Sequence, residues 1–331
     1  MGGCRGMDLK EQVLEILEEN RGQHYSGALI ADELGVTRAA VSKAVGALRS
    51  DGHEISSLTN RGYCLSEQSD VLSAQGIARL LGEKSAEFCM HVYQSVCSTN
   101  TVLKEMAQAG AQAGTVVIAR QQTAGRGRFG RSFYSPPSGG LYLSVLLRPE
   151  LGVQESLFIT TAVAVAVAQA IEAVFPQTKV GIKWVNDLYV AGKKVCGILT
   201  EASLDFESGK LEYAVVGIGV NISTKDFPED ISAKAGAIQG QTQGPVKMRL
   251  AAEILTRVME EMRDISSHKH LDEYRNRSVL LGREVDVLCG DAALPATVLE
   301  INDQANLVVR LQDGSKKVLS SGEVSIRPKK I

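Results

Sequence analysis

The chain has 331 residues, of which 44% are hydrophobic and 22% are charged, and its net charge at pH 7 is −2. A chain of this length is too long for one ordinary hydrophobic core, so we expect two or three domains. The composition is that of a soluble globular protein. Because the chain as a whole is not basic, any nucleic acid that it binds must be held by a local patch.

The six cysteines are scattered, and no pair of them has CxxC spacing. This pattern argues against a zinc site and a dense disulfide framework, and it favours a reducing cytoplasm. Residues 1–10 lack the apolar segment of a signal peptide. The most apolar stretch, 157–175, is interrupted by threonine, glutamine and glutamate, so we expect a buried core helix and no membrane interaction.

The first segment is rich in helical patterns. Apolar residues at helical spacing predict a helix over 7–19, a second helix over 27–34 and a third over 38–50. Two short alternating stretches, 54–58 and 63–65, then predict a pair of strands joined by a turn. Three helices followed by a hairpin are the layout of a winged helix-turn-helix.

The third of these helices and the tip of the hairpin carry side chains that suit DNA. A recognition helix offers its early side chains to base edges, and a hairpin tip contacts phosphates. The preceding helix is acidic, with Asp32 and Glu33, so only an oriented face would bind DNA. A helical packing module without a DNA role is the alternative. The predicted DNA-binding residues are Thr37, Arg38, Ser42, Lys43 and Arg61.

The pattern of residue types changes at a polar stretch, 66–70, which predicts a linker, and it changes again near residue 278. The middle part mixes apolar strands with helices, and the last part has only short strands and turns, which is typical of a small SH3-like β-barrel. We therefore expect an α+β chain of three domains: a winged helix-turn-helix over 1–67, a mixed α/β domain over 71–277 and the barrel over 278–331.

The sharpest motif is the glycine- and arginine-rich loop over 125–131, which follows an apolar strand predicted at 115–119. It contains GxGxxG, but the prolines and glycines within 132–140 exclude the helix that a dinucleotide fingerprint requires. Glycines let backbone amides approach phosphate oxygens, and arginines supply charge and forked donors. The loop thus predicts an anion site, with a solvated basic loop or an RNA-binding patch as alternatives.

Four further motifs are weak when each is taken alone. Residues 98–100 could hold a polar, uncharged ring or cap the helix at 101–109. Residues 183–187 could bind a nucleotide or Mg²⁺, or form an Asx turn. The lysine leading into 192–199 could neutralise a carboxylate or phosphate, or lie in a hairpin turn. Glycines within 217–221 allow close approach by a ligand or by another backbone.

Taken in order, the motifs Ser-Thr-Asn, GRGR-x-GR, KW-x-ND, GKK-x-x-GIL and G-x-G-x-N resemble the signature series of biotin protein ligases. The resemblance covers nearly the whole chain. The first segment is similar to the DNA-binding domain of the bifunctional biotin-operon repressor class, and the last segment is similar to its small C-terminal domain. A central catalytic domain of the class II synthetase type is implied.

The resemblance also implies which residues would bind biotin. Arg128 and Lys194 would be catalytic, with Lys194 on the biotin carboxylate and then on the mixed anhydride. Val185 stands where the family often has a proline. The implied biotin-binding residues are Ser98, Thr99, Asn100, Gln122, Gly125, Arg126, Arg128, Lys194, Gly217 and Gly219.

A second set would bind the nucleotide. Phe133 stands where the family often has a tryptophan over the adenine, and Asn186 with Asp187 would touch the nucleotide and its metal ion. The chain itself is assigned no permanent metal site. The implied nucleotide-binding residues are Arg126, Gly127, Arg128, Arg131, Phe133, Asn186, Asp187 and Asn221.

The implied reaction joins biotin and ATP, with Mg²⁺, into biotinyl-5′-AMP and pyrophosphate. Biotin then passes to a lysine of the biotin carboxyl carrier protein of acetyl-CoA carboxylase. The adenylate would also act as corepressor, since loaded chains would form a homodimer that binds operator DNA and represses biotin biosynthesis genes. A ligand-sensing repressor without ligase activity and a lipoate–protein ligase are the alternatives.

Overall fold

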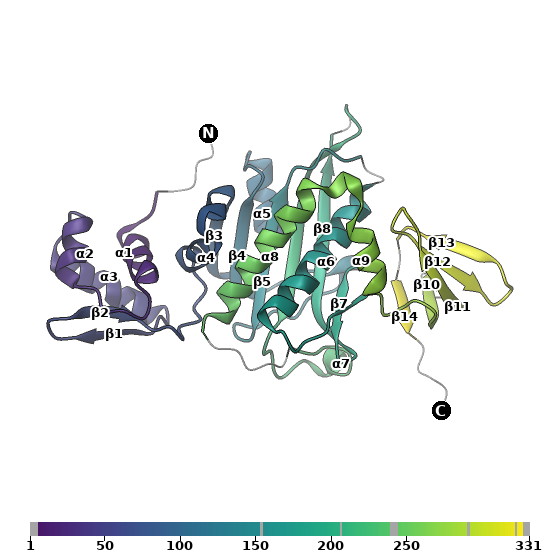
Figure 1. Cartoon of the computed structure of the whole chain (residues 1–331). Coiled ribbons are helices and arrows are strands. Elements are labelled where there is room, and N and C mark those ends of the chain that lie inside the picture. The colour runs from purple at the N-terminus through teal and green to yellow at the C-terminus, as the bar shows by residue number, and fades with distance from the viewer. Residues whose placement is uncertain are drawn as a thin grey trace.

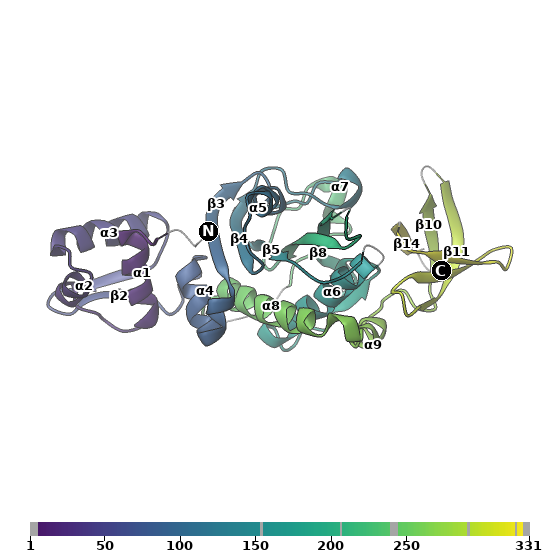
Figure 2. The same cartoon turned by 90° about the horizontal axis from the view of Figure 1, so that it is seen from above.

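The computed structural model describes residues 6–152, 155–205, 207–238, 244–289, 292–321 and 323–326. Its elements form three groups in a row, with a helical group and hairpin at one end, a large sheet in the middle and a small sheet at the other end (Figures 1 and 2). The α+β class predicted from the sequence is confirmed. The domain limits 1–67, 71–277 and 278–331 stay a prediction.

The N-terminal group is the predicted winged helix-turn-helix. Its helices are α1 (Leu9–Glu19), α2 (Gly27–Glu33) and α3 (Arg38–Ser50), and its antiparallel hairpin is β1 (Ile55–Leu58) with β2 (Gly62–Leu65). The third helix was predicted with the same limits, because its capping residue and its apolar spacing are both local signals. It buries one face against α1 and α2, using Val41, Ala44, Val45 and Leu48.

The polar stretch predicted to be a linker, 66–70, makes hydrogen bonds to the segments on both sides of it. Arg21 donates from Nη1 to the carbonyl oxygens of Ser66 and Ser69, at 2.9 Å each. Ser69 is buried, and Asp70 accepts a hydrogen bond of 2.9 Å from the amide of Lys247. Buried backbone carbonyls need donors. Arg21 thus binds the linker to the N-terminal group, and Asp70 binds the linker to α8 of the central group.

The central sheet has seven strands in the order β3-β4-β5-β9-β8-β7-β6. The first two strands are parallel and the other pairs are antiparallel. The strands are β3 (Cys89–Val96), β4 (Thr115–Gln122), β5 (Gly140–Leu147), β6 (Gly181–Lys183), β7 (Asp187–Val190), β8 (Lys193–Leu204) and β9 (Leu211–Asn221).

Helices cover both faces of this sheet (Figure 2). The larger core lies under α4 (Ala74–Leu81), α6 (Ser156–Val174), α8 (Val246–Arg263) and α9 (His270–Asn276). A smaller core lies under α5 (Thr99–Gln108) on the opposite face. Short helical turns complete the group at α7 (Glu229–Ser232), Gly82–Glu87 and Ile265–Ser267.

Helix α6 is the apolar stretch that was predicted to be buried. By length and composition it could cross a membrane, but 78% of its most apolar window is buried inside the protein. The high mean hydropathy of α6 follows from this buried position, since a helix that is surrounded by other elements needs no polar face. The sheet lies on one side of it, and α8 and α9 pack on the other sides.

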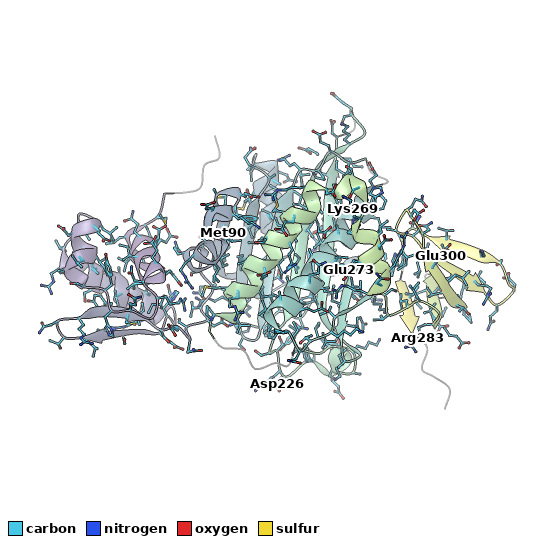
Figure 3. All side chains as sticks on the ribbon, in the orientation of Figure 1. Met90, Asp226, Lys269, Glu273, Arg283 and Glu300 are labelled. Atoms are coloured by element: carbon cyan, nitrogen blue, oxygen red, sulfur yellow. The ribbon has the colours of Figure 1, made fainter. Side chains whose placement is uncertain are left out.

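The C-terminal group is one antiparallel sheet in the order β13-β12-β11-β10-β14. Its buried residues continue the core of the central group, so the two groups share one hydrophobic interior. Figure 3 labels Glu273 on α9 and Glu300 on β11 of this sheet. The strands are β10 (Glu284–Cys289), β11 (Ala292–Ile301), β12 (Leu307–Leu311), β13 (Lys316–Leu319) and β14 (Glu323–Ile326).

One cysteine departs from what the spacing indicated. Cys64, Cys97 and Cys196 are free, as expected for a chain without a dense disulfide framework. Cys89 on β3, however, is disulfide-bonded. The scattered spacing gave no sign of this bridge, because a disulfide depends on which cysteines the fold brings within a few ångströms of each other.

His270 on α9 makes the stability of the fold sensitive to acid. Its ring is buried and lies 3.0 Å from the Thr161 hydroxyl oxygen. Burial, followed by the neighbouring His268, lowers the pKa of His270 from 6.5 to about 4. Between these two values the unfolded chain binds a proton that the folded chain does not bind. The free energy of unfolding therefore falls as the pH falls through this window.

We expect His270→Gln to lose less stability than the parent protein when the pH is lowered from neutral to about 4, because glutamine keeps a polar side chain but binds no proton. Thermal melting of both proteins across this range measures the difference. Equal slopes in the two proteins would show that His270 does not contribute to the acid sensitivity.

Candidate functional site

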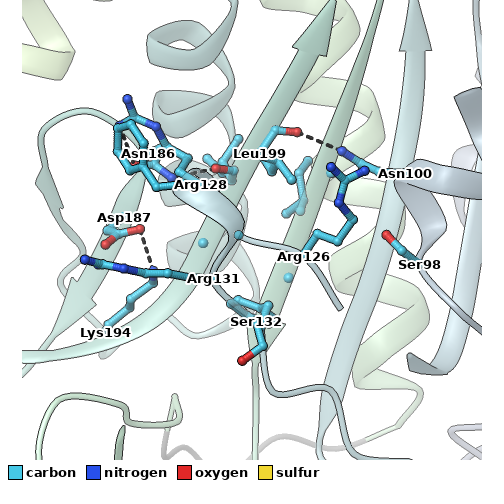
Figure 4. Close-up of a pocket in the computed structure, with 18 of the residues that line it drawn as sticks. Ser98, Asn100, Arg126, Arg128, Arg131, Ser132, Asn186, Asp187, Lys194 and Leu199 are labelled. Atoms are coloured by element: carbon cyan, nitrogen blue, oxygen red, sulfur yellow. Dashed lines mark hydrogen bonds and ion pairs between the residues drawn. The ribbon is translucent and has the colours of Figure 1, made fainter. Parts of the chain in front are cut away.

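A pocket opens on the central sheet beneath the glycine- and arginine-rich loop (Figure 4). The start of α5, the end of β4, the loop itself, the β6–β7 turn and strands β8, β9 and β14 all contribute to its wall. It is lined by Ser98, Thr99, Asn100, Gln122, Arg126, Gly127, Arg128, Phe129, Arg131, Ser132, Phe133, Lys183, Trp184, Asn186, Asp187, Lys194, Gly197, Ile198, Leu199, Gly217, Ile218, Gly219 and Val324.

The structure thus brings together nearly all the residues that the sequence predicted to bind biotin or the nucleotide. Two of them do not line the pocket. Gly125 is buried behind the loop, where its carbonyl accepts a 2.8 Å bond from the amide of Phe133. Asn221 is 5% exposed at the end of β9, and its buried Oδ1 has no hydrogen-bond partner among the described residues. The ligand roles of all these residues stay predictions.

The loop is folded by its own backbone. The amide of Gly127 donates to the carbonyl of Arg131 at 2.7 Å, and Arg128–Gly130 forms a single 3₁₀ turn. Phe129 at the centre of that turn has a φ of 56°, and its side chain is 66% exposed. The loop therefore reverses direction over the pocket, and this places Arg126 and Arg128 above the sheet (Figure 4).

Two glycines form part of the floor. Gly197 on β8 and Gly219 on β9 are directly paired across the two strands. A methyl group on Gly219 would collide with the ring of Phe133, and one on Gly197 would lie 3.0 Å from the same ring. The ring of Phe133 therefore packs directly against a surface without side chains. Glycines inside strands commonly mark such close approaches.

Lys194 is paired with a carboxylate in this structure. Its Nζ lies 2.6 Å from Oδ1 of Asp187, and both side chains are partly exposed to the pocket. Across the antiparallel pair of β7 and β8, Asp187 is the partner of Gly197 and Lys194 is the partner of Tyr189, and a register shift lies between these two pairs. Cys196 lies two residues further along β8 on the opposite, buried side. Burial raises the pKa of its thiol, so it is no nucleophile at neutral pH.

The Lys183–Asp187 segment is anchored from two directions. Trp184 donates from Nε1 to the carbonyl of Ala305 at 2.9 Å, and the Tyr274 hydroxyl donates to the carbonyl of Val185 at 2.9 Å. Trp184 and Tyr274 are both buried. The C-terminal group and α9 thereby fix the turn that presents Asn186 to the pocket. Asn186 also contacts the loop, because its Oδ1 accepts a 3.4 Å hydrogen bond from Nη1 of Arg128.

The wall formed by the start of α5 is polar and buried. Ser98, Thr99 and Asn100 are 3%, 4% and 3% exposed, although they line the pocket. The sequence left open whether Ser98 caps α5. It stands at the N-cap position, but its side chain makes no capping hydrogen bond. Buried hydroxyl and amide groups that face a pocket suit a ligand with polar ring atoms.

Several lining residues were not predicted. Lys183, Trp184, Ile198 and Leu199 lie inside motifs that were recognised, so their position beside predicted residues was a usable signal. Val324 comes from β14 in the C-terminal group. No local pattern connects Val324 to the motifs, because its place in the pocket depends on how the two groups pack.

The predicted DNA-binding residues lie on the N-terminal group, away from the pocket. All of them are exposed, in contrast to the apolar residues on the opposite face of α3. Thr37 also caps the helix, since its Oγ1 accepts a 3.2 Å bond from the amide of Ala40. Arg49 is different, because its Nε donates to the carbonyl of Ile55 and so supports the hairpin. The exposed set is Thr37, Arg38, Ser42, Lys43 and Arg61.

Comparison with known proteins agrees with this division. Residues 92–221 match the biotin/lipoate A/B protein ligase family, and residues 10–64 match a helix-turn-helix domain. The chain is 31% identical over 95% of its length to the bifunctional ligase/repressor BirA of Bacillus spizizenii, and it covers 97% of that protein. It is 30% identical to the protein of the same name from Escherichia coli, over 92% and 94% of the two chains.

Solved structures give the same answer for the catalytic part. The biotin protein ligase of Aquifex aeolicus, in complex with biotin and ATP, aligns with a TM-score of 0.61 and 28% identity, over 72% of this chain and 98% of that one. The matched regions combine a ligase fold with a DNA-binding fold in one polypeptide. The chain belongs to the family of bifunctional biotin ligase/repressors.

We expect Gly217→Ala to weaken binding of biotin by about tenfold or more, because overpacking a buried site commonly costs about 1–3 kcal/mol. A methyl group there would overlap Oδ1 of the buried Asn100. Titration calorimetry with biotin measures the change. Gly46→Ala is the matched control, since a methyl group on this exposed position of α3 meets nothing within 4 Å. Equal affinities for the two variants would place the ligand elsewhere.

Proposed function

We propose that the chain activates biotin with ATP and transfers it to a lysine of the biotin carboxyl carrier protein of acetyl-CoA carboxylase. The observation that carries this proposal is the pocket itself. It combines a buried polar wall, an arginine loop and a lysine at one site. A polar ring, a carboxylate and a phosphate would each meet a complementary surface there.

In the first step, an oxygen of the biotin carboxylate attacks the α-phosphorus of ATP. A new oxygen–phosphorus bond forms, and the bond to the leaving pyrophosphate breaks. Both reactants are anions, so charge repulsion opposes their approach. Lys194, Arg126 and Arg128 offset that repulsion with fixed positive charge, which preserves its effect in a site shielded from water.

Mg²⁺ fits this site as a companion of the nucleotide. Asp187 is the lining carboxylate, and no group of three or more histidine, cysteine, aspartate or glutamate side chains that could hold a metal ion occurs among the described residues. Mg²⁺ is commonly held by one or two carboxylates together with phosphate oxygens. Asp187 with Asn186 would hold it beside the phosphates, where it supplies further positive charge.

In the second step, the amine of the carrier lysine attacks the carbonyl carbon of biotinyl-5′-AMP. An amide bond forms, AMP leaves with the bonding electron pair, and the amine loses a proton. The mixed anhydride is sensitive to water, so the loop over the pocket protects it. The reaction requires no nucleophile from the protein, which agrees with the buried position of Cys196.

The polar wall favours biotin over lipoate. The biotin ring carries N–H and C=O groups that can pair with Thr99, Asn100 and Ser98. The ring of lipoate has only carbon and sulfur atoms and offers these groups no hydrogen bond, and a site built to bind polar ring atoms discriminates against an analogue that lacks them.

One incubation tests the ligase proposal. The full chain with biotin, ATP and Mg²⁺ should yield biotinyl-5′-AMP, identified by its mass, and the same mixture with carrier protein should add one biotin to it. If neither product is formed, the chain senses its ligand as a repressor but is not a ligase. We place the reaction in the cytoplasm, where carrier and DNA are both accessible.

We expect Lys194→Ala to slow adenylate formation by about 10²–10³-fold, because removing one preorganised charge from a reacting centre has effects of this size. Quenched-flow measurement of adenylate formation with saturating substrates gives the rate. The control is Lys193→Ala, since Lys193 is exposed and lies 3.4 Å from the carbonyl of Ser232. If the two variants are equally fast, Lys194 has no role in activation.

We further propose that the adenylate is a corepressor. Each chain has one recognition helix, and specific reading of DNA commonly requires two half-sites related by the symmetry of a dimer. Strand β3 forms one edge of the central sheet. That edge, together with the loop over the pocket, would form the dimer surface. The carrier would use the same surface, so carrier and dimer compete.

We expect biotin and ATP to shift the chain toward a dimer and to tighten its binding to operator DNA, typically by about 1–3 kcal/mol of coupling free energy. Sedimentation with and without both ligands measures the first effect. Arg38→Ala and Lys43→Ala should weaken operator binding, whereas Lys316→Ala, an exposed lysine on β13, should not. An unchanged mass with ligands would contradict the corepressor role and leave the ligase role intact.

A further inference from the structure

The register shift between β7 and β8 lies directly beside Lys194. Asp187 of β7 pairs with Gly197 of β8, and Tyr189, two residues further along β7, pairs with Lys194. The same step on β8, from 197 to 194, takes three residues, so Val195 is the extra residue of a β-bulge. Bulges of this kind commonly redirect a side chain beside a functional site.

The bulge places Lys194 and Gly197 on one face of the sheet. Asp187 and Tyr189 are two apart on β7 and share a face, and directly paired residues share the face of their partners. In a regular strand, residues three apart would point to opposite faces. Because Gly197 has no side chain, the side chain of Lys194 lies across it. A methyl group on Gly197 would be 3.3 Å from both Cε and Nζ of Lys194.

A separate segment of the chain occupies the other side of Lys194. Strand β9 accompanies β8 only as far as Cys196. After Asn221, the last residue of β9, the chain turns away, and the next amide donates to the carbonyl of Gly139 at 2.9 Å. The place beside Lys194 is taken by the 234–236 segment, which pairs with it in parallel.

This segment forms hydrogen bonds with the backbone of Lys194. The amide of Lys194 donates to the carbonyl of Lys234 at 2.9 Å, and the amide of Gly236 donates to the carbonyl of Lys194 at 2.8 Å. The amide of Ile238 then donates to the carbonyl of Asn221 at 2.9 Å, which returns the segment to the end of β9. The 234–236 segment therefore continues the sheet where β9 has left it, at the bulged start of β8.

Gly236 permits this close approach. It is buried, and a methyl group on it would lie 2.6 Å from Cβ of Lys193. A Cβ atom is fixed to the backbone, so no change of side-chain rotamer can relieve this overlap. An alanine at 236 would thus push the 234–236 segment away from the start of β8. Since Lys194 follows Lys193 directly, the displacement would reach the residue that carries the ammonium.

We propose that Gly236 is a positioning residue for Lys194. The segment that it allows to pair with β8 holds the bulge, and the bulge directs the ammonium into the pocket. A fixed charge lowers a barrier because it is placed before the reaction begins, and a displacement of about 1 Å can cost about 10²-fold in rate. This role deepens the ligase function proposed above and rests on it.

The test is the rate at which the full chain forms biotinyl-5′-AMP with saturating biotin, ATP and Mg²⁺, measured by quenched flow. Gly236→Ala should slow this step by about 10- to 100-fold. The matched control is Gly27→Ala, because a methyl group there lies 3.0 Å from the ring of Tyr63 in the N-terminal group and should leave the rate unchanged. Thermal melting verifies that both variants are folded.

Two double-mutant cycles separate this role from general damage to the site. In a Lys194→Ala background, Gly236→Ala should cost less than about twofold, since no ammonium remains to be positioned. In a Lys193→Gly background it should also cost less than about twofold, because the Cβ atom that the new methyl group meets is gone. General damage would slow the step by the same factor in all three backgrounds.

An unchanged rate in Gly236→Ala would overturn the positioning role. A loss that persists in full in the Lys194→Ala background would also overturn it, since the segment would then act through another group. The same holds if Lys193→Gly fails to restore the rate. A parent chain that forms no biotinyl-5′-AMP contradicts the ligase proposal itself, and the positioning role falls with it.

Discussion

The pocket concentrates positive charge before any anionic ligand is present, and two carboxylates of the sheet make this possible. Asp187 holds Lys194, and Glu201 holds Arg126. Without these partners the cations would repel each other under the loop. A binding anion can replace a carboxylate as the partner of each cation, so the charge is already arranged for the reaction and needs little reorganisation.

The rest of the fold holds the pairs of Asp187 with Lys194 and of Glu201 with Arg126 in place. Antiparallel pairing of β7 with β8 sets Asp187 opposite the strand of Lys194. Glycines at 197 and 219 then bring the loop down onto the sheet through the ring of Phe133. The C-terminal group secures the other side, since the carbonyl of Ala305 holds the ring of Trp184. Its small sheet is therefore part of the site rather than an appendage.

The N-terminal group is joined to the catalytic part by polar contacts as well as by the chain. Arg120 on β4 donates to the carbonyl of Asp51 at 2.9 Å, just after the recognition helix ends. Glu18 of α1 is buried and pairs with Arg21 and with Arg79 of α4. Removing one partner of a buried pair is costly. The helix-turn-helix is thus held at a defined position relative to the sheet on which we place the dimer surface.

Local signals determined much of this protein. The capping threonine and the apolar spacing set α3, and the composition of 157–175 predicted a buried helix. The order of the glycine, arginine and lysine motifs indicated the family and most of the pocket residues. Only the tertiary structure decided the partners: Asp187 for Lys194, the disulfide of Cys89, and Glu201 behind the polar wall. The contacts of Glu201 with Asn100 and Arg126 join segments far apart in the chain, which local spacing does not record. Asp187 and Lys194 are close in sequence, but their contact depends on how β7 and β8 pair, and that pairing includes a register shift.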